Sequence, residues 1–360
     1  MSCPSLHILG SPGLGGAERF FIRLVNGLAE RHEGIGVALR PKSPVARFLH
    51  PNVAVHPVPM VNGWDLWSVL RIRAVIRRIR CPVVQTYMGR ATRLTRVPRD
   101  AGAVHIARLG GYYKIRGYYT HAHAWIGNTK GICDYLIRNG LPAERVYFIP
   151  NFVSAPPPVP EETLKTLRAT WRIPEEAWVV FSLGRFVPKK GFMDLLSAFS
   201  RLPRSIAGRP VVLVMAGDGP QRDELKRHSE TLGLGPHVRF VGWQDEPAPF
   251  FALSHVFVCP SRHEPLGNVI LEAWSHAVPV VSTETVGAGE LMAEGGTGIL
   301  TPVSDPVAMA RAIQQLLEDA GLRRELGENG LKTVTERYSK DRVIGHYVDL
   351  YEKLVGSCPS

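Results

Sequence analysis

The sequence predicts an α/β fold of two Rossmann-like domains that face each other across a cleft. Short apolar runs alternate with stretches of helical periodicity along the chain, as in parallel sheets covered by helices. A glycine-rich turn, SPGLGGAER, follows the first apolar run, which is typical of the opening of a nucleotide-binding α/β domain. The proline-rich run SAPPPVP at 154–160 predicts a linker, and the same alternation restarts after it. The length of 360 residues suits two domains of roughly 150 to 200 residues each.

The elements follow in a regular order. In the first half, strands are expected at 6–9, 36–39, 53–58, 83–85, 104–107, 124–126 and 146–149, and a helix at 20–30. In the second half, strands are expected at 178–183, 211–216, 238–240, 256–259 and 278–282. Helices are expected there at 191–202, 221–232, 267–276 and 308–318, with helical segments up to 355. This succession predicts a mostly parallel, doubly wound sheet in each half.

Composition excludes several protein classes. Apolar residues make up 45% and charged residues 21%, which excludes disorder, collagen and coiled coil. The five cysteines have no CxxC spacing, so neither a disulfide framework nor a zinc site is expected. No apolar run approaches the roughly 18 residues of a membrane-spanning helix, and the first residues lack a secretory signal pattern. A cytoplasmic location is therefore expected.

Positive charge is concentrated in the first half of the chain. The net charge is +11, yet residues 1–155 hold 21 Lys and Arg against 7 Asp and Glu, whereas the remainder holds 22 against 25. This asymmetry predicts an anionic partner for the first half: nucleic acid, an anionic membrane surface or a phosphorylated substrate.

The densest basic segment is WDLWSVLRIRAVIRRIR at 64–80, which has the spacing of an amphipathic helix. Its arginines are Arg71, Arg73, Arg77, Arg78 and Arg80. The plain interpretation is a helix packed on a sheet with solvated arginines. A second interpretation, compatible with the first, adds contact between Arg71–Arg80 and anionic lipid headgroups.

The segment CPSRHEPLGNVILEAWSH at 259–276 carries the strongest chemical signal. A buried strand is expected to end before Glu264, and a helix to begin near Gly267. Free backbone N–H groups at Leu266, Gly267, Asn268 and Val269 would form a diphosphate site at that helix start. Glu272 lies eight residues after Glu264, or about 12 Å along a helix, which suits separate contacts to a transferring group and to a ribose.

A second segment, SLGRFVPKKGF at 182–192, places two cations after another strand. The strand is expected to end at Gly184, and Arg185 and Lys190 lie on the following loop. Cations at the carboxyl edge of a parallel sheet can bind phosphate oxygens and neutralise a leaving diphosphate. The AGDGP run at 216–220 predicts another strand-to-turn junction, with Asp218 as a turn or cap residue. No Asp-x-Asp signature is present, so no metal is expected.

These motifs occur in an order shared with a known family. GGAER, IPNFV, GRFVPKKGF, AGDGP and the Glu264-x7-Glu272 spacing together resemble the retaining, nucleotide-sugar-dependent glycosyltransferases of family 4, or glycosyl transferases group 1, which have the GT-B fold. The resemblance runs over nearly the whole chain. Residues 108–153 further resemble bacterial members that build lipopolysaccharide core or related envelope glycans.

The resemblance implies roles in the donor site. Arg185 and Lys190 would hold the donor diphosphate, and Gly184 just before them would also belong to the donor-binding site. Glu264 would contact the transferring sugar. Glu272 would hold the ribose hydroxyls, and the backbone of residues 266–269 would bind phosphate.

The same resemblance implies the domain plan and the other half of the site. Residues 1–155 would form the acceptor domain and 156–337 the donor domain, with a final helix at about 338–360 packing back on the first domain. The loop with Gly13, Gly15 and Gly16 would lie against donor and acceptor. Many relatives have a histidine near the sugar where this chain has Arg108, with His105 three residues earlier; these two residues are candidates for contact with an anionic acceptor or sugar.

The implied reaction moves a sugar from a nucleotide sugar to an acceptor hydroxyl, with retention of configuration, and uses no metal or other cofactor. The departing phosphate would accept the proton of the hydroxyl, since no carboxylate pair indicates a double displacement. The expected acceptor is an anionic or lipid-linked glycan such as lipopolysaccharide core. The expected place is the cytoplasm, peripheral on the inner face of the plasma membrane.

Other functions fit the sequence less well. A nicotinamide dehydrogenase needs GxGxxG and an acidic residue about 20 positions later, and the glycine-rich turn lacks both. A nucleic-acid-binding protein would explain the basic half, but no binding module with interleaved stacking aromatics is recognisable. A GT-B phosphorylase and a non-catalytic nucleotide-sugar-binding protein remain alternatives on fold alone.

Overall fold

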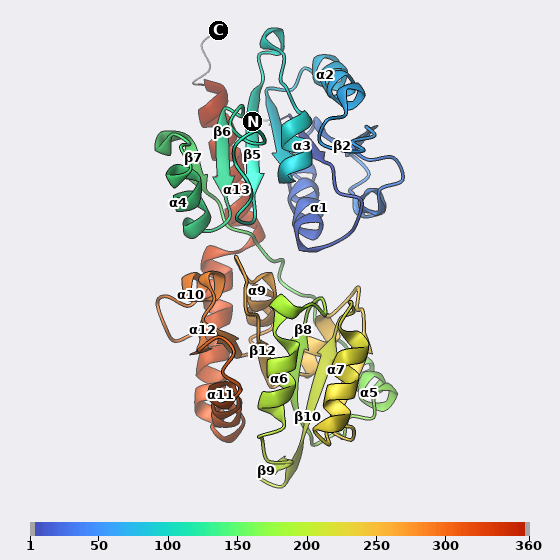
Figure 1. The fold of residues 1–360 in the computed structure, drawn as a ribbon, viewed down its shortest axis with the longest axis vertical. Coiled ribbons are helices and arrows are strands. Elements are labelled where there is room, and N and C mark those ends of the chain that lie inside the picture. The colour runs from blue at the N-terminus through green and yellow to red at the C-terminus, as the bar shows by residue number, and fades with distance from the viewer. Residues whose placement is uncertain (1–3, 357–360) are drawn as a thin grey trace. The chain divides into compact units, whose positions relative to one another are not determined.

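A computed structural model of the chain describes residues 4–356. The chain divides into two compact units, shown in Figure 1. The N-terminal unit contains the residues up to Phe152 and those from Lys340 onward, and the C-terminal unit is Val153–Ser339. Each unit is a sheet of mainly parallel strands between helices, which confirms the predicted α/β fold.

The N-terminal sheet has the strand order β3-β2-β1-β4-β5-β6-β7, and all its pairings are parallel. Its strands are β1 (Ser5–Leu9), β2 (Ile35–Leu39), β3 (Ala54–Pro57), β4 (Val83–Tyr87), β5 (Val104–Leu109), β6 (Ala124–Gly127) and β7 (Val146–Phe148). Its α-helices are α1 (Gly16–Ala29), α2 (Leu66–Ile79), α3 (Met88–Leu94), α4 (Lys130–Arg138) and α13 (Lys340–Gly356). Short 3-10 turns lie at η1 (Pro44–Phe48), η2 (Arg99–Ala101) and η3 (Ala143–Arg145).

The C-terminal sheet repeats this topology with the order β11-β10-β8-β12-β13-β14. Its strands are β8 (Trp178–Leu183), β10 (Arg209–Ala216), β11 (Val238–Gly242), β12 (Val256–Cys259), β13 (Val280–Thr283) and β14 (Gly298–Thr301), and β9 (Ser205–Ile206) pairs antiparallel with β10. Its α-helices are α5 (Glu161–Thr170), α6 (Phe192–Phe199), α7 (Arg222–Thr231), α8 (Ala248–Leu253), α9 (Asn268–Ser275), α10 (Val286–Leu291), α11 (Pro306–Glu318) and α12 (Ala320–Arg337), and η4 (Pro188–Lys190) is a 3-10 turn.

In both sheets the first strand lies in the middle. The next strands are added on one side of it, and the later strands are added on its other side. The change of direction lies between β1 and β4 in the N-terminal sheet and between β8 and β12 in the C-terminal sheet. Loops that leave the carboxyl ends of such neighbouring strands diverge to opposite faces of the sheet, which opens a crevice suited to a ligand.

Helix α13 belongs to the N-terminal core although it lies at the other end of the sequence. Its side chains Val343, Ile344, Tyr347, Leu350 and Tyr351 are buried with residues of α1, β4 and β5. Figure 1 shows this last helix, in red, among the blue and green elements of the N-terminal unit.

Candidate functional site

The loops after β8 and β12 lie at the change of direction in the C-terminal sheet. β8 pairs directly with β12, so the loop from Gly184 to Gly191 and the loop from Pro260 to Gly267 leave adjacent strand ends. Their backbones also contact each other, because Arg262 and His263 donate their N–H groups to the carbonyl of Lys189 at 2.8 and 3.2 Å. The two segments with the strongest sequence signals therefore form one site.

Lys190 and Glu264 form an ion pair across these loops. The ammonium of Lys190 donates to Oε2 of Glu264, and both side chains are mostly buried, with 23% and 14% of their surface exposed. Burial acts to lower the pKa of Lys190, but the attraction of the Glu264 carboxylate outweighs it, so the pKa is raised above its usual value. Lys190 thus remains a cation. It lies beside the Glu264 carboxylate, where the loops after β8 and β12 meet.

Helix α9 begins beside this pair. Its N-cap residue, Gly267, has a φ of +89°, a left-handed conformation that residues with a side chain rarely adopt. Leu266 and Gly267 are buried, whereas Asn268, Val269 and Glu272 are partly exposed. The helix start therefore lies directly after the Glu264 loop, as the sequence predicts, and the N–H of Ile270 closes its first turn by donating to the carbonyl of Gly267 at 2.9 Å.

Arg185 is exposed on the loop after β8, next to the buried Phe186. The AGDGP turn holds this loop by backbone hydrogen bonds: Gly184 N donates to the carbonyl of Ala216 at 3.0 Å, and Phe186 N donates to that of Asp218 at 2.9 Å. Asp218 caps its own turn by accepting from Gly219 N at 2.8 Å, which confirms a turn role.

Two residues that the sequence analysis does not single out support the site. Asp194 on α6 is buried and accepts two hydrogen bonds from Arg262, at 2.8 and 2.7 Å, which ties α6 to the loop before Glu264. Gly287 on α10 donates its N–H to the carbonyl of Glu264 at 3.0 Å, and a Cβ at Gly287 would lie 2.5 Å from the nitrogen of Leu266. The same strand–loop–helix rule, applied to β13 and α10, is the signal that could have indicated Gly287.

The glycine-rich loop of the N-terminal unit leads from β1 into α1. Gly15 is the N-cap of α1 and donates its N–H to Glu18 at 2.9 Å, while Gly16 is the first helical residue. A Cβ placed on Gly13 would meet nothing within 4 Å, so this position is open. The loop lies at the change of direction of its own sheet, which is where such loops bind ligands.

Arg108 and His105 lie on opposite faces of β5, because side chains alternate along a strand. Arg108 is buried: its Nε donates to the Tyr347 hydroxyl at 2.9 Å, it also donates to Asn151, and its guanidinium lies over the ring of Phe20 at 3.9 Å. These contacts join Arg108 to the core and to α13.

His105 is buried too, 3.0 Å from the hydroxyl of Thr86. Burial and the neighbouring His121 and His123 hold its pKa well below the usual value. The structure does not bring Arg108 and His105 together, and contact of either residue with a sugar or acceptor stays a prediction.

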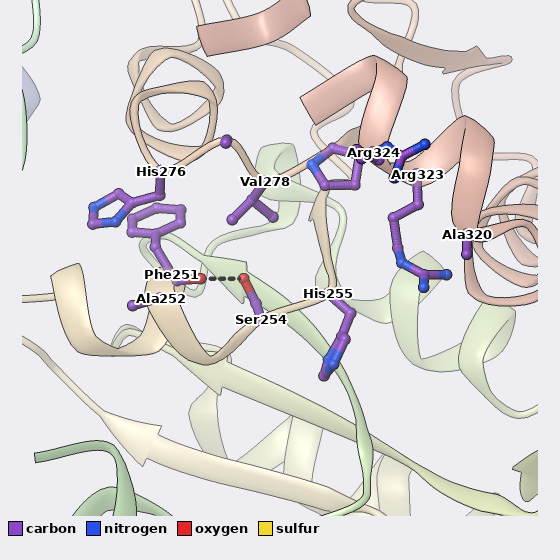
Figure 2. A pocket seen from close by; sticks show the side chains of 11 residues that line it. Phe251, Ala252, Ser254, His255, His276, Val278, Ala320, Arg323 and Arg324 are labelled. Atoms are coloured by element: carbon purple, nitrogen blue, oxygen red, sulfur yellow. Dashed lines mark hydrogen bonds between the residues drawn. The ribbon is translucent and has the colours of Figure 1, made fainter. Parts of the chain in front are cut away.

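A shallow pocket of about 290 Å³ lies at the opposite edge of the C-terminal sheet (Figure 2). His255 and Val278 line it just before β12 and β13 begin, together with Phe251, His276 and Arg323. Ligands of such sheets bind at the carboxyl ends of the strands, and this pocket is at the amino ends. It is therefore separate from the site built around Lys190 and Glu264.

Residues 4–356 contain neither a metal-binding cluster nor a membrane-spanning helix. No group of three or more His, Cys, Asp or Glu side chains in this part of the chain is placed to hold a metal ion. None of the helices described is both long enough and apolar enough to cross a membrane.

Comparisons with known proteins agree with the geometry. The family described as Glycosyl transferases group 1 matches residues 165–333, and Glycosyltransferase Family 4 matches residues 14–155. The lipopolysaccharide core biosynthesis glycosyltransferase LpsE of Rhizobium meliloti is 37% identical over 338 residues, which cover 93% of this chain and 95% of that protein.

Solved structures share the fold over the full length. A glycosyltransferase from Rickettsia africae has a TM-score of 0.86 at 17% identity and covers 99% of both chains. Anabaena HepE, solved in complex with UDP and glucose, has a TM-score of 0.81 at 20% identity, with 98% of this chain and 100% of that chain covered. The predicted GT-B fold is thereby confirmed, and the chain belongs to the family 4 (group 1) glycosyltransferases.

Proposed function

We propose that the protein transfers a sugar from a nucleoside diphosphate to a hydroxyl of a lipid-linked glycan of the lipopolysaccharide-core type, with retention of anomeric configuration. The observation that carries the proposal is the Lys190–Glu264 pair at the junction of β8 and β12, directly before the start of α9. The name of LpsE supports the acceptor class, and the UDP and glucose in the HepE structure support the donor class.

The proposed roles rest on charge and position. Lys190 and the exposed Arg185 bind the diphosphate, together with the amide groups at 266–269. Glu264 contacts the transferring sugar, and Glu272, on the second turn of α9, binds the ribose hydroxyls. The loop at Gly13, Gly15 and Gly16 contributes from the N-terminal unit.

The proposed chemistry breaks the bond between the anomeric carbon and the β-phosphate oxygen, whose electron pair stays with the phosphate. The acceptor oxygen forms its bond to the same face of the sugar, and its proton passes to the leaving phosphate. Negative charge develops on the diphosphate, and Lys190 and Arg185 stabilise it. No metal or other cofactor is part of the proposed reaction.

A lipid-linked acceptor implies work at a membrane. The N-terminal half of the sequence carries most of the positive charge, and the five arginines of Arg71–Arg80, on and just after α2, are exposed. We place the protein in the cytoplasm, peripheral on the inner face of the plasma membrane, with Arg71–Arg80 toward anionic lipid.

The site is tested by Glu264→Ala and Lys190→Ala. Each is expected to reduce sugar transfer by at least about tenfold, since each removes one charge from the reacting region. Lys189→Ala is the matched control, because Lys189 is the exposed neighbour of Lys190 and contributes its carbonyl to the loop. Wild-type turnover in both site variants would refute the assignment.

The donor and the stereochemistry need separate measurements. A thermal-shift screen with UDP-, GDP- and ADP-sugars is expected to show one nucleotide that raises the melting temperature of wild type but not of Lys190→Ala. NMR of the product formed from an α-linked donor is expected to show an α-linkage. A β-linkage would overturn retention and leave the donor site in place.

A further inference from the structure

Helix α2 and the turn before it expose large apolar side chains. Trp64, Leu66, Trp67 and Leu70 have 78%, 77%, 62% and 56% of their surface exposed. The regular apolar spacing of this segment suggests one stripe packed on the sheet, but Leu66 and Leu70 lie outside that stripe. Figure 1 shows α2 at the periphery of the N-terminal unit. We call these four residues the α2 apolar patch.

The patch and the packed side of the helix point in different directions. Successive residues of an α-helix are turned by about 100°. The buried Ser68, Ile72 and Ile76 therefore share one side, and the three patch residues within the helix, all but Trp64, occupy the other side of its first two turns. In the last turns that exposed side is taken over by Arg77 and Arg78. The exposed side is thus apolar at its beginning and cationic at its end.

Further guanidinium groups surround the aromatic rings. Arg93, from α3, lies over the ring of Trp64 at 3.4 Å and over that of Tyr118 at 4.9 Å. Arg71 lies 5.8 Å from the centre of the Trp67 ring. These guanidinium groups therefore lie against aromatic rings and remain in contact with solvent. Side chains of this kind can bury their apolar part while keeping the charged or polar end in water.

Carboxylates do little to balance these cations. Within residues 4–356, Arg77 alone among the five arginines of 71–80 forms an ion pair with a carboxylate, that of Asp100 at 3.0 Å. Burial, with the nearby Arg93 and Arg73, lowers the pKa of Arg96. The field around α2 is therefore positive.

We infer that the α2 apolar patch inserts into the headgroup–acyl boundary of an anionic bilayer, with Arg71, Arg78 and Arg80 bound to lipid phosphates at its edge. The inference deepens the proposed membrane attachment and rests on it. A bilayer fits both halves of the surface, because it offers an apolar layer directly beneath a continuous sheet of negative charge. Tryptophan and arginine side chains are suited to that depth.

The first test measures binding to vesicles of phosphatidylcholine with phosphatidylglycerol by co-sedimentation. A variant with Leu66→Ser, Trp67→Ser and Leu70→Ser is expected to bind at least about tenfold more weakly than wild type. The matched control changes three exposed apolar residues of the C-terminal unit, Val303→Ser, Val307→Ser and Leu331→Ser, and is expected to bind like wild type.

Charge is tested on its own. Arg71→Gln, Arg78→Gln and Arg80→Gln are each expected to weaken binding about fivefold, and phosphatidylcholine alone is expected to bind poorly. The control substitutions are Arg201→Gln, Arg204→Gln and Arg227→Gln, at exposed positions of the C-terminal unit. Circular dichroism and melting temperature establish that each variant is folded.

Insertion has its own signal. Brominated lipid is expected to quench tryptophan fluorescence of wild type on binding. A variant with Trp64→Phe and Trp67→Phe keeps the apolar surface and is expected to bind normally while losing most of that quenching.

The outcomes separate the proposals. Vesicle binding that requires the arginines but is unchanged by the serine substitutions overturns insertion and leaves electrostatic attachment. Absence of vesicle binding, with intact transfer to a delipidated acceptor, overturns both membrane proposals and leaves the transfer reaction. A dimer in ultracentrifugation that the serine substitutions dissolve assigns the patch to a second copy and overturns the inference.

Discussion

A buried network of side-chain hydrogen bonds connects β1, β4 and α13 in the N-terminal unit. His7 on β1 lies 3.0 Å from the Ser5 hydroxyl and 2.9 Å from that of Tyr87. Gln85 donates to Tyr87 at 2.6 Å and accepts from Tyr351 of α13 at 2.7 Å. Each polar group in this network has a partner, which offsets the cost of burying it. The histidine can meet these partners as a neutral ring.

His7 predicts a loss of stability in acid. Burial lowers its pKa to about 3, whereas the unfolded chain binds a proton near 6.5. Between these values the unfolded state holds more protons, so stability is full above pH 6.5 and falls as the pH drops toward 3. Urea unfolding measures the free energy of unfolding at pH 7 and at pH 5. The decrease from pH 7 to pH 5 is expected to be about 2 kcal/mol larger for wild type than for His7→Gln.

His346→Gln is the control, since this histidine is exposed on α13. In this variant the decrease in the free energy of unfolding from pH 7 to pH 5 is expected to equal that of wild type. An equal pH dependence in wild type and His7→Gln would show that other groups cause the acid loss.

At the scale of residues, the sequence predicts where a side chain lies when that position follows from the end of a strand. It does not predict contacts between residues that are far apart in the sequence. Lys190 and Glu264 were identifiable because each comes after a predicted strand, and strand ends of a parallel sheet share an edge. Arg108 follows the strand predicted at 104–107, whereas β5 continues to Leu109 and includes it. Its hydrogen bond to Tyr347 joins residues 239 positions apart, and no local pattern indicates it.

At the scale of elements, the junction from η4 to α6 is fixed by backbone contact. Gly191 has a φ of +69°, and a Cβ there would lie 1.8 Å from the carbonyl oxygen of Pro260. The loop that carries Lys190 and the loop that leads to Glu264 therefore touch through a position with no side chain. Close approach of the two loops depends on this glycine.

Gly191→Ala is expected to destabilise the C-terminal unit and weaken donor binding. The left-handed φ costs about 1–2 kcal/mol with a side chain, and relief of the clash with Pro260 adds roughly 1–3 kcal/mol. Gly208→Ala isolates the first cost, since Gly208 has a φ of +75° and open space around it. Urea unfolding and nucleotide titration measure both effects, and equal losses in the two variants would contradict the argument.

Most elements could be predicted because their apolar periodicity is strong. The predicted strand at 178–183 coincides with β8, and that at 256–259 with β12. Helix α1 begins at Gly16, before the predicted start at 20, because Glu18 caps a turn of glycines that carries no apolar signal. Helix α5 was missed because none of its residues is buried.

At the scale of the whole molecule, the two ends of the chain share one core. The side chain of Ile344 packs so closely on α1 that a Cβ at Gly27 would lie 2.9 Å from its Cδ1. Ile344 is 1% exposed, and α13 brings it into the cluster that contains β1, β4 and β5 residues. The N-terminal unit is thus built from two separate stretches of sequence.

Ile344→Ala is expected to destabilise the N-terminal unit by about 2–5 kcal/mol, as a cavity in a packed core does. Hydrogen exchange of the amides of β1, β4 and β5 should become faster, while β8, β10 and β12 exchange as in wild type. Uniform acceleration in both sheets would contradict the assignment of α13 to the N-terminal core alone.

The position of α13 also determines the order of events during synthesis. Residues up to Phe152 leave the ribosome before residues 153–339, and the helix that completes their core leaves after both. Residues 153–339 are one uninterrupted stretch that contains every strand of the C-terminal sheet. This stretch is therefore complete before α13 is synthesised. The N-terminal unit therefore completes its core only after the C-terminal unit has been synthesised. Until then the side chains that pack on α13 lack that cover, a period in which a nascent chain is open to chaperones and to misassembly.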